Sequence, residues 1–148
     1  MPFHFPLQAV LHLRQSIEHQ QELRLHAANQ QVARVRQLML RIDARIQEFR
    51  QESSQELELG TRAAVIRFTV ALESILDAKR QELEMQLLRV MQIRDQQQKA
   101  FEKARQEREK FQLSFERALR EYRICKDRRD QKLLDELFLL QRAFRKRG

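Results

Sequence analysis

Apolar side chains recur at alternating steps of three and four residues along much of the chain. Such a repeat places them on one face of a helix and is typical of a coiled coil. Val10, Leu13 and Ile17 are expected to join it after a slip of one residue, which relaxes the supercoil locally. The main repeat lasts four heptads and comprises Leu25, Ala28, Val32, Val35, Met39, Ile42, Ile46 and Phe49.

The second part of the chain carries a similar apolar repeat in two stretches. The first comprises Leu76, Leu83, Leu87 and Val90, and the second comprises Phe101, Ala104, Phe111, Phe115, Ala118, Tyr122 and Cys125. Cys125 is therefore expected to be a small buried residue. The polar interruptions are Arg80, Arg94, Gln97 and Arg108. Polar residues in such a seam either fix the register of two helices or turn outward where the seam drifts, and for Arg94 we expect the outward orientation.

Residues that break helices are confined to the start of the chain and to one internal position. Pro2 and Pro6 lie within the first six residues, and Pro6 suits a first helical turn. Gly60 is typical of the position just after a helix, and Thr61 can cap the next one. The sequence thus predicts an all-α fold: helices over residues 7–58 and 62–146, joined by a turn at 59–61. A short turn between long amphipathic helices favours an antiparallel hairpin, here a single domain over residues 1–148.

Composition excludes several classes of protein. The 148 residues include two Gly and two Pro, too few for a sandwich, a barrel or a doubly wound sheet, all of which need frequent turns. The single Cys excludes a disulfide scaffold and a Cys-rich zinc module. The sequence has no run of about 18 apolar residues, so no direct membrane insertion is expected.

Candidate catalytic and metal-binding residues are few. His12, His19 and His26 repeat every seven residues. Helical neighbours at this spacing lie about 10.5 Å apart, too far to share a metal ion. The sequence also contains no Gly-rich phosphate loop and no HExxH motif. We expect no enzymatic activity, no cofactor and no metal.

The predicted helices are unequal, so the end of the second one has no partner in the hairpin. With a turn at Gly60, Leu7 lies opposite about residue 113 and the second helix overhangs by about 30 residues. Residues 1–60 carry no net charge, whereas residues 117–148 carry a net charge of +6. Phe115, Ala118 and Tyr122 continue the apolar stripe past residue 113, and the last part of the overhang adds Leu133, Leu134, Leu137, Phe138, Leu139, Leu140 and Phe144. A helix that is both apolar and cationic is expected to bind a partner that offers apolar surface and negative charge.

Apolar residues also exceed the needs of one seam near the turn. Phe68, Leu72 and Ile75 form a second stripe beside the seam, and Leu38 flanks it on the first helix. Two explanations are open: a wide seam, or a separate binding patch at the tip of the hairpin. Two functions of other classes are also open for the whole chain. A basic coiled coil can bind nucleic acid, although the interleaved acidic residues argue against this, and the overhangs of several copies can pair in a structural homo-oligomer.

Both ends of the sequence resemble one family. The opening Phe3-His4-Phe5-Pro6-Leu7, continued by Val10-Leu11-His12-Leu13-Arg14, resembles the F-x-F-x-L-x-x-V-L-x-x-R start of FliJ proteins of the flagellar type III export apparatus. Arg129-Asp130-Gln131-Lys132-Leu133-Leu134-Asp135-Glu136 is similar to the family's D-x-K-x-x-D-E segment. Length, basicity and the single turn agree with this resemblance.

The resemblance implies a non-catalytic stalk in flagellar protein export, with no nucleic acid as partner; the equivalent stalk of a virulence injectisome is the alternative. The implied partners are the export ATPase FliI, FliH, the export gate protein FlhA and export chaperones. The implied location is the cytoplasm, peripheral to the cytoplasmic face of the inner membrane at the flagellar base. The ATPase would bind the overhang at Leu133, Leu134, Leu137, Phe138, Leu140, Arg142, Phe144 and Arg145. The gate would bind the tip at Leu38, Ile42, Phe49, Phe68, Leu72, Ile75 and Lys79. Arg45 and Lys79 depart from the family pattern there.

Overall fold

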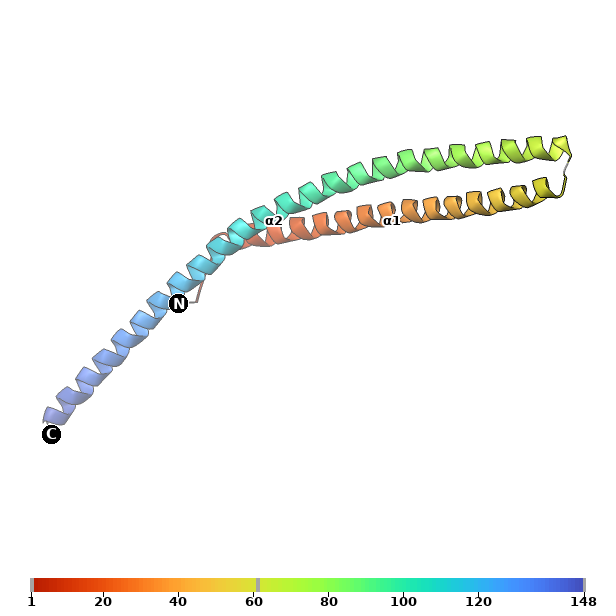
Figure 1. The fold of residues 1–148 in the computed structure, drawn as a ribbon. Helices are drawn as coiled ribbons and strands as arrows, with labels where there is room; N and C mark the ends of the chain where they lie inside the picture. The colour runs from red at the N-terminus through yellow and green to blue at the C-terminus, as the bar shows by residue number, and fades with distance from the viewer. Residues whose placement is uncertain (1, 61, 148) are drawn as a thin grey trace. The chain divides into compact units, whose positions relative to one another are not determined.

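The computed structural model describes residues 2–60 and 62–147, and its architecture is an antiparallel pair of helices of unequal length (Figure 1). Helix α1 spans Gln8–Glu58 and helix α2 spans Ala63–Arg147. The described residues contain no strand. The all-α hairpin with a longer second helix is therefore confirmed. The chain divides into two compact units, one of residues 20–102 and one of residues 1–19 with 103–148.

Gly60 ends the first helix in the way that its position in the sequence predicts. Its φ angle is 77°, in the left-handed region that glycine adopts without steric cost. The Gly60 N–H donates to the Leu57 carbonyl at 3.3 Å, which satisfies one of the free carbonyls at the helix end. Helix α2 then begins with the Arg62 carbonyl, which accepts the Val65 N–H at 3.0 Å. Thr61, the expected cap, lies outside the described residues.

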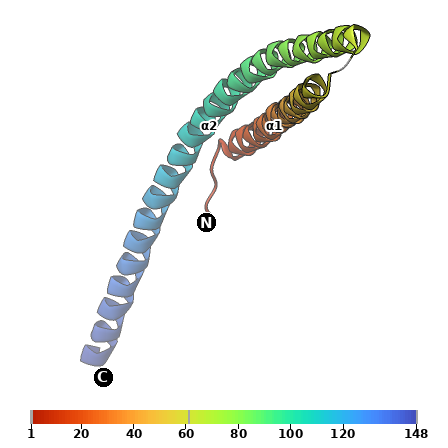
Figure 2. The same ribbon diagram turned by 45° about the vertical axis from the view of Figure 1, so that its right-hand side comes forward.

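In the unit of residues 20–102, the two helices pack through the predicted seam, and Figure 2 shows them side by side up to the turn. The buried side chains are Ala28, Val32, Val35, Ile46 and Leu83. Leu76, Leu87 and Val90 are half-buried beside them. These residues follow one heptad repeat on each helix, so the apolar pattern alone identifies the packed face.

Two ion pairs of opposite polarity cross this seam near the turn. Arg80 of α2 binds Asp43 of α1, and this hydrogen bond and charge raise the pKa of the Arg80 guanidinium. One heptad closer to the turn, Arg50 of α1 donates to Glu73 of α2 at 2.9 Å. A slip of one heptad would bring Asp43 beside Glu73, or Arg50 beside Arg80. Both slips place like charges together, so the pairs select one register.

Further from the turn the seam is polar, and here the expectation for Arg94 is wrong. The Arg94 side chain is 26% exposed, less than the 59% of its ion-pair partner Asp95, so it lies along the packed face. Gln97 is also half-buried, and its Oε1 atom accepts no hydrogen bond within the described chain. The seam keeps its heptad phase through both positions, because the long stem of an arginine can pack while its charged end reaches solvent.

In the other unit, α1 continues the same heptad phase at Leu11, Arg14 and Glu18; of the residues expected after a slip, Val10 and Ile17 are half-buried and Leu13 is not. Leu11 is buried and Arg14 and Glu18 are half-buried, whereas Leu13 is exposed. The sequence pattern missed this because two of these seam positions are charged, while Val10 and Ile17 are the apolar residues nearby. The charged side chains are stabilised by specific partners on α2.

Glu18 pairs across the seam with Arg108 of α2. The Arg108 Nε donates to Glu18 at 2.6 Å, and the two side chains are 25% and 19% exposed. This hydrogen bond raises the pKa of Arg108. Next to this pair, the Arg14 guanidinium lies 5.8 Å from the centre of the Phe111 ring, a cation–π contact. Arg108 is thus one of the predicted polar interruptions, and its role is to pair the two helices.

Replacement of Gln97 by an apolar residue is expected to stabilise the protein. The Gln97→Leu variant removes a buried amide oxygen without a partner and adds an apolar contact to the seam. We expect the free energy of unfolding to rise by about 1 kcal/mol, measured by thermal or urea unfolding followed by circular dichroism. Gln98→Leu, at the exposed neighbouring position, is the matched control and should change little. If Gln97→Leu is less stable than the parent, the side-chain amide of Gln97 forms hydrogen bonds in solution that the variant has lost.

Candidate functional site

The end of α2 is an uncovered helix. Every described residue from Arg123 to Arg147 is exposed. The exposed residues include large apolar side chains: Leu137 is 57% exposed and Phe144 is 76% exposed. The other predicted overhang residues are likewise exposed: Leu133, Leu134, Phe138, Leu139, Leu140, Arg142 and Arg145.

The overhang begins later than the sequence predicts, because the N-terminal segment covers its base. Phe3 packs against Phe115 and Tyr122, with ring centres 5.6 and 5.3 Å away. Phe5 is buried, with its ring centre 5.4 Å from that of Phe115. These α2 residues were expected to belong to the open stripe, and that expectation is wrong.

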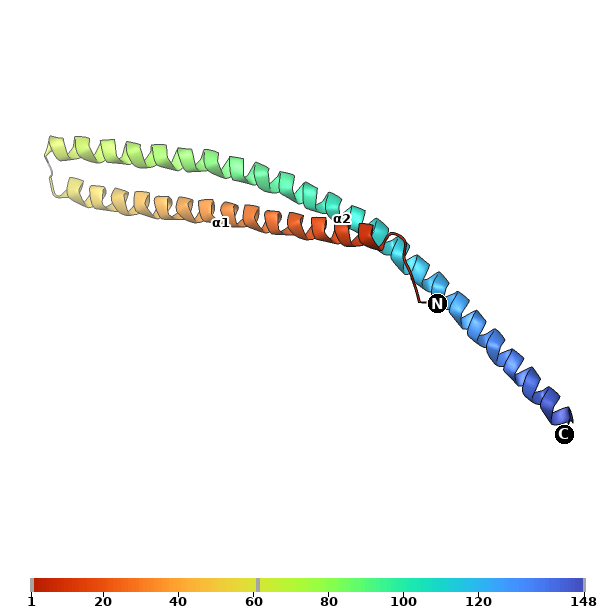
Figure 3. The same ribbon diagram turned by 180° about the vertical axis from the view of Figure 1, so that it is seen from behind.

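The covering residues precede the point at which the predicted hairpin begins. Residues 2–5 are not helical, and the chain turns into α1 through Pro6 and Leu7 (Figure 3). The prediction placed Leu7 as the first residue opposite α2 and gave the residues before it no partner. Their aromatic side chains extend the seam past that point.

The exposed overhang has an apolar face and a basic face. Leu133, Leu137, Leu140 and Phe144 are spaced by four, three and four residues, so they share one face of the helix. Leu134 and Phe138 lie beside that face, and Arg145 lies next to them. Lys132, Arg142 and Lys146 lie on the opposite side. A partner for this segment must therefore present apolar surface to one side and negative charge to the other.

The apolar face of the overhang is not a simple continuation of the intramolecular seam. The seam passes through Phe115, Ala118 and Tyr122, and the same repeat would continue at Cys125 and Arg129. The overhang stripe begins at Leu133, and two successive steps of four residues turn it by about 100° around the helix relative to the seam. The expectation that Cys125 is buried is also wrong, because this side chain is exposed. The overhang therefore presents a surface of its own.

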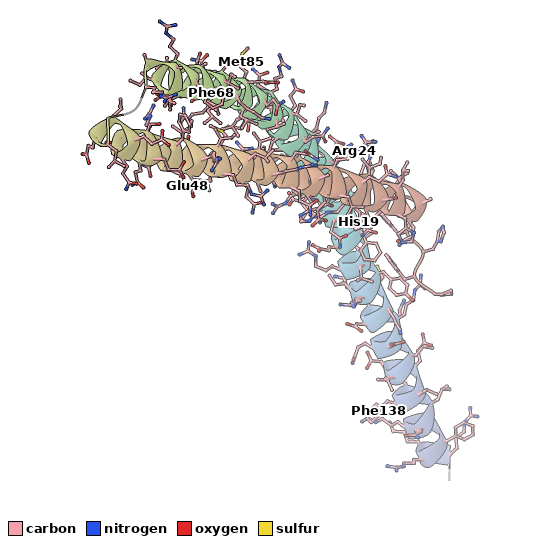
Figure 4. The ribbon with its side chains drawn as sticks, turned by 90° about the vertical axis from the view of Figure 1, so that its right-hand side faces the viewer. His19, Arg24, Glu48, Phe68, Met85 and Phe138 are labelled. Atoms are coloured by element: carbon pink, nitrogen blue, oxygen red, sulfur yellow. The ribbon has the colours of Figure 1, made fainter. Side chains whose placement is uncertain are left out.

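The seven residues predicted at the tip do not share one surface. Phe68 and Ile75 are 67% and 65% exposed, and Lys79 is exposed beside them. Leu38 is close to half-buried, at 37%. The remaining three are half-buried in the seam: Ile42, Phe49 and Leu72. The exposed part of the patch is thus formed chiefly by α2, where Phe68 is labelled in Figure 4.

Other candidate chemistry is sparse in the described chain. His12 and His26 each share a hydrogen bond with a glutamine four residues away, at 3.0 and 3.2 Å. Within residues 2–60 and 62–147, no three His, Cys, Asp or Glu side chains gather in a way that could hold a metal ion. In the same residues, no helix is both long and apolar enough to cross a membrane.

These features define the class as an α-helical coiled-coil protein that exposes large apolar side chains at a basic helix end and near its turn. The chain belongs to the FliJ family, because the family model of the flagellar FliJ protein matches residues 3–148. Members of this family are components of the flagellar type III export apparatus and act in flagellum biogenesis and protein export. Comparisons with curated proteins and with solved structures found no match.

Removal of the Phe3 ring, which packs against Tyr122, is expected to expose Tyr122 to solvent. Tyr122 is the only tyrosine and the chain has no tryptophan, so intrinsic fluorescence reports on this residue alone. We expect Phe3→Ala to increase quenching of this fluorescence by acrylamide and to lower stability by about 1 kcal/mol. Phe138→Ala, which removes an exposed ring on the same helix, is the control and should leave the quenching unchanged. Equal quenching in the parent and in Phe3→Ala would mean that the ring contact does not form in solution.

Proposed function

We propose that this chain is a non-catalytic stalk that couples the export ATPase to the export gate in the flagellar apparatus. Its overhang binds FliI and promotes assembly and activity of the ATPase ring, with FliH nearby, and its tip contacts FlhA. Export chaperones are a further class of partner in this proposal. The location is the cytoplasm, peripheral to the cytoplasmic face of the inner membrane at the flagellar base. The observation that carries the proposal is the exposed apolar and basic segment of residues 123–147.

The physical case for the overhang rests on burial and charge. Each large apolar side chain of the stripe gains about 1.5–3 kcal/mol when it is fully removed from water. Four such residues on one face, from Leu133 to Phe144, are enough for a stable protein contact if a partner closes around them. The basic side chains on the opposite face favour a partner with acidic groups and increase the rate of encounter. A ring with a central pore can contact both faces at once.

The physical case for the tip is narrower. Phe68 and Ile75 expose two large apolar side chains close to the turn, with Lys79 beside them. Exposed aromatic and aliphatic residues of this kind are the usual anchors of a protein interface. Ile42, Phe49 and Leu72 support this surface from the seam and present little area of their own. The gate contact is therefore assigned mainly to the α2 side of the tip.

A negative charge introduced on the apolar face of the overhang is expected to abolish stimulation of the ATPase. We expect Leu137→Glu or Phe144→Glu to remove the increase in hydrolysis rate and the formation of rings by the cognate flagellar ATPase. Far-UV circular dichroism should stay unchanged, because both positions are exposed. Leu139→Glu is the matched control: it makes the same chemical change on the basic side of the helix and should retain most of the stimulation.

Stimulation that survives both Leu137→Glu and Phe144→Glu would overturn the role assigned to the overhang. Equal loss in the Leu139→Glu control would show that net charge, and not the apolar face, carries the effect.

Replacing two side chains at the tip by alanine is expected to weaken binding to the gate protein only. The Phe68→Ala, Leu72→Ala double variant removes an exposed anchor and its support, and we expect an affinity loss of about tenfold or more for the gate protein. Binding to the ATPase should be unchanged. Val70→Ala, an exposed position on the same turn of α2, is the control. Loss of ATPase binding in the double variant would contradict a division of labour between tip and overhang.

A further inference from the structure

A second heptad repeat runs along α2 on the face away from α1. Phe68, Ile75 and Met85 are all at least 60% exposed on this stretch, and Figure 4 labels two of them. Exposed alanines alternate with these large side chains, and Glu82 occupies the one polar position. The full set is Ala64, Phe68, Ala71, Ile75, Ala78, Glu82 and Met85, which we call the outer stripe.

The outer stripe has the spacing of a coiled-coil interface. Its steps are alternately four and three residues, as in the seam, but it is rotated by about 160° around the helix from seam residues such as Leu76 and Leu83. It spans about three heptads within the unit of residues 20–102. A repeat of this length predicts a second helical neighbour, and every residue of the outer stripe is exposed within this chain.

The outer stripe is complementary to itself when two copies run antiparallel. With Ile75 opposite Ala78 of a second copy, a large side chain faces a small one, and the twofold axis repeats the contact. The same register sets Phe68 opposite Met85 of the second copy, where sulfur and an aromatic ring attract each other.

Charge also selects the antiparallel arrangement. Glu82 lies in the outer stripe and Arg67 borders it, and neither has an ion-pair partner among the described residues. In the antiparallel register, Arg67 of one copy lies within one helical turn of Glu82 of the other, and symmetry supplies two such pairs. A parallel pairing would instead bring Arg67 next to Arg67 and Glu82 next to Glu82.

We propose that this protein pairs with a second copy of itself through the outer stripe of α2, in an antiparallel arrangement. The pairing covers Phe68 and Ile75. Because these two residues belong to the tip surface assigned to the gate, a paired chain cannot present that surface. This consequence rests on the proposed function, whereas the pairing itself does not.

The test is sedimentation equilibrium of the full chain over a range of concentrations, in a Cys125→Ser background that prevents disulfide formation. We expect a dimer whose dissociation constant rises at least about tenfold in Met85→Glu and stays within a few-fold of the parent in Met85→Leu. Arg67→Glu and Glu82→Arg should each weaken the dimer, and the double variant should restore it. A purely monomeric parent, or a double variant no stronger than the singles, would overturn the proposal.

Two comparisons separate self-association through the outer stripe from self-association through the overhang and from the proposed gate contact. Dimer formation that is lost in Leu137→Glu but kept in Met85→Glu would assign self-association to the overhang and overturn the outer stripe. Met85 lies outside the residues assigned to the gate, so Met85→Glu should still bind the gate protein. If the dimer behaves as expected but no tip variant affects gate binding, the proposed function fails and the pairing stands.

Discussion

Two helices alone can make only one interface, and this limit shapes the rest of the molecule. Each helix buries a single narrow stripe, such as Val32 and Val35 on α1 and Leu83 on α2. Any apolar side chain off that stripe stays in water, because no third element covers it. In a globular protein, residues like Phe68 or Leu137 would be core residues. Here the same residues form surfaces, and the family to which the chain belongs works through assembly with other proteins.

A narrow seam also leaves little apolar packing to specify register, so charged residues take over that task. A heptad slip moves one leucine-like side chain onto another at small cost, but it cannot exchange Asp43 and Arg50 without creating repulsion. Glu18 and Arg108 act in the same way in the other unit, with better shielding from water. Half-buried pairs of this kind add less stability than apolar residues of the same size, and their value is that they discriminate between alignments.

The fold and its packed faces could be predicted from the sequence, because helix breakers and heptad spacing are local signals. Gly60 and the run from Leu25 to Phe49 illustrate this. Pairing between distant side chains is not a local signal, so the apolar pattern did not identify Arg14 and Glu18 as seam positions. The cover formed by Phe3 and Phe5 was missed because the predicted hairpin began at Leu7, so the residues before it were given no partner on α2. For the tip, the sequence identified the apolar excess but could not separate Phe68, which is exposed, from Leu72, which supports the seam.

The turn at Gly60 has a consequence for how this chain tolerates change in length. A side chain built at this position would meet no atom within 4 Å, so the turn is open on its outer side. The entropic cost of a longer loop grows only slowly with its length, and extra residues here leave both heptad repeats in phase. An insertion within either helix, by contrast, rotates every later side chain by about 100° per residue. Length variation and inserted labels are therefore best accommodated at this one corner of the hairpin.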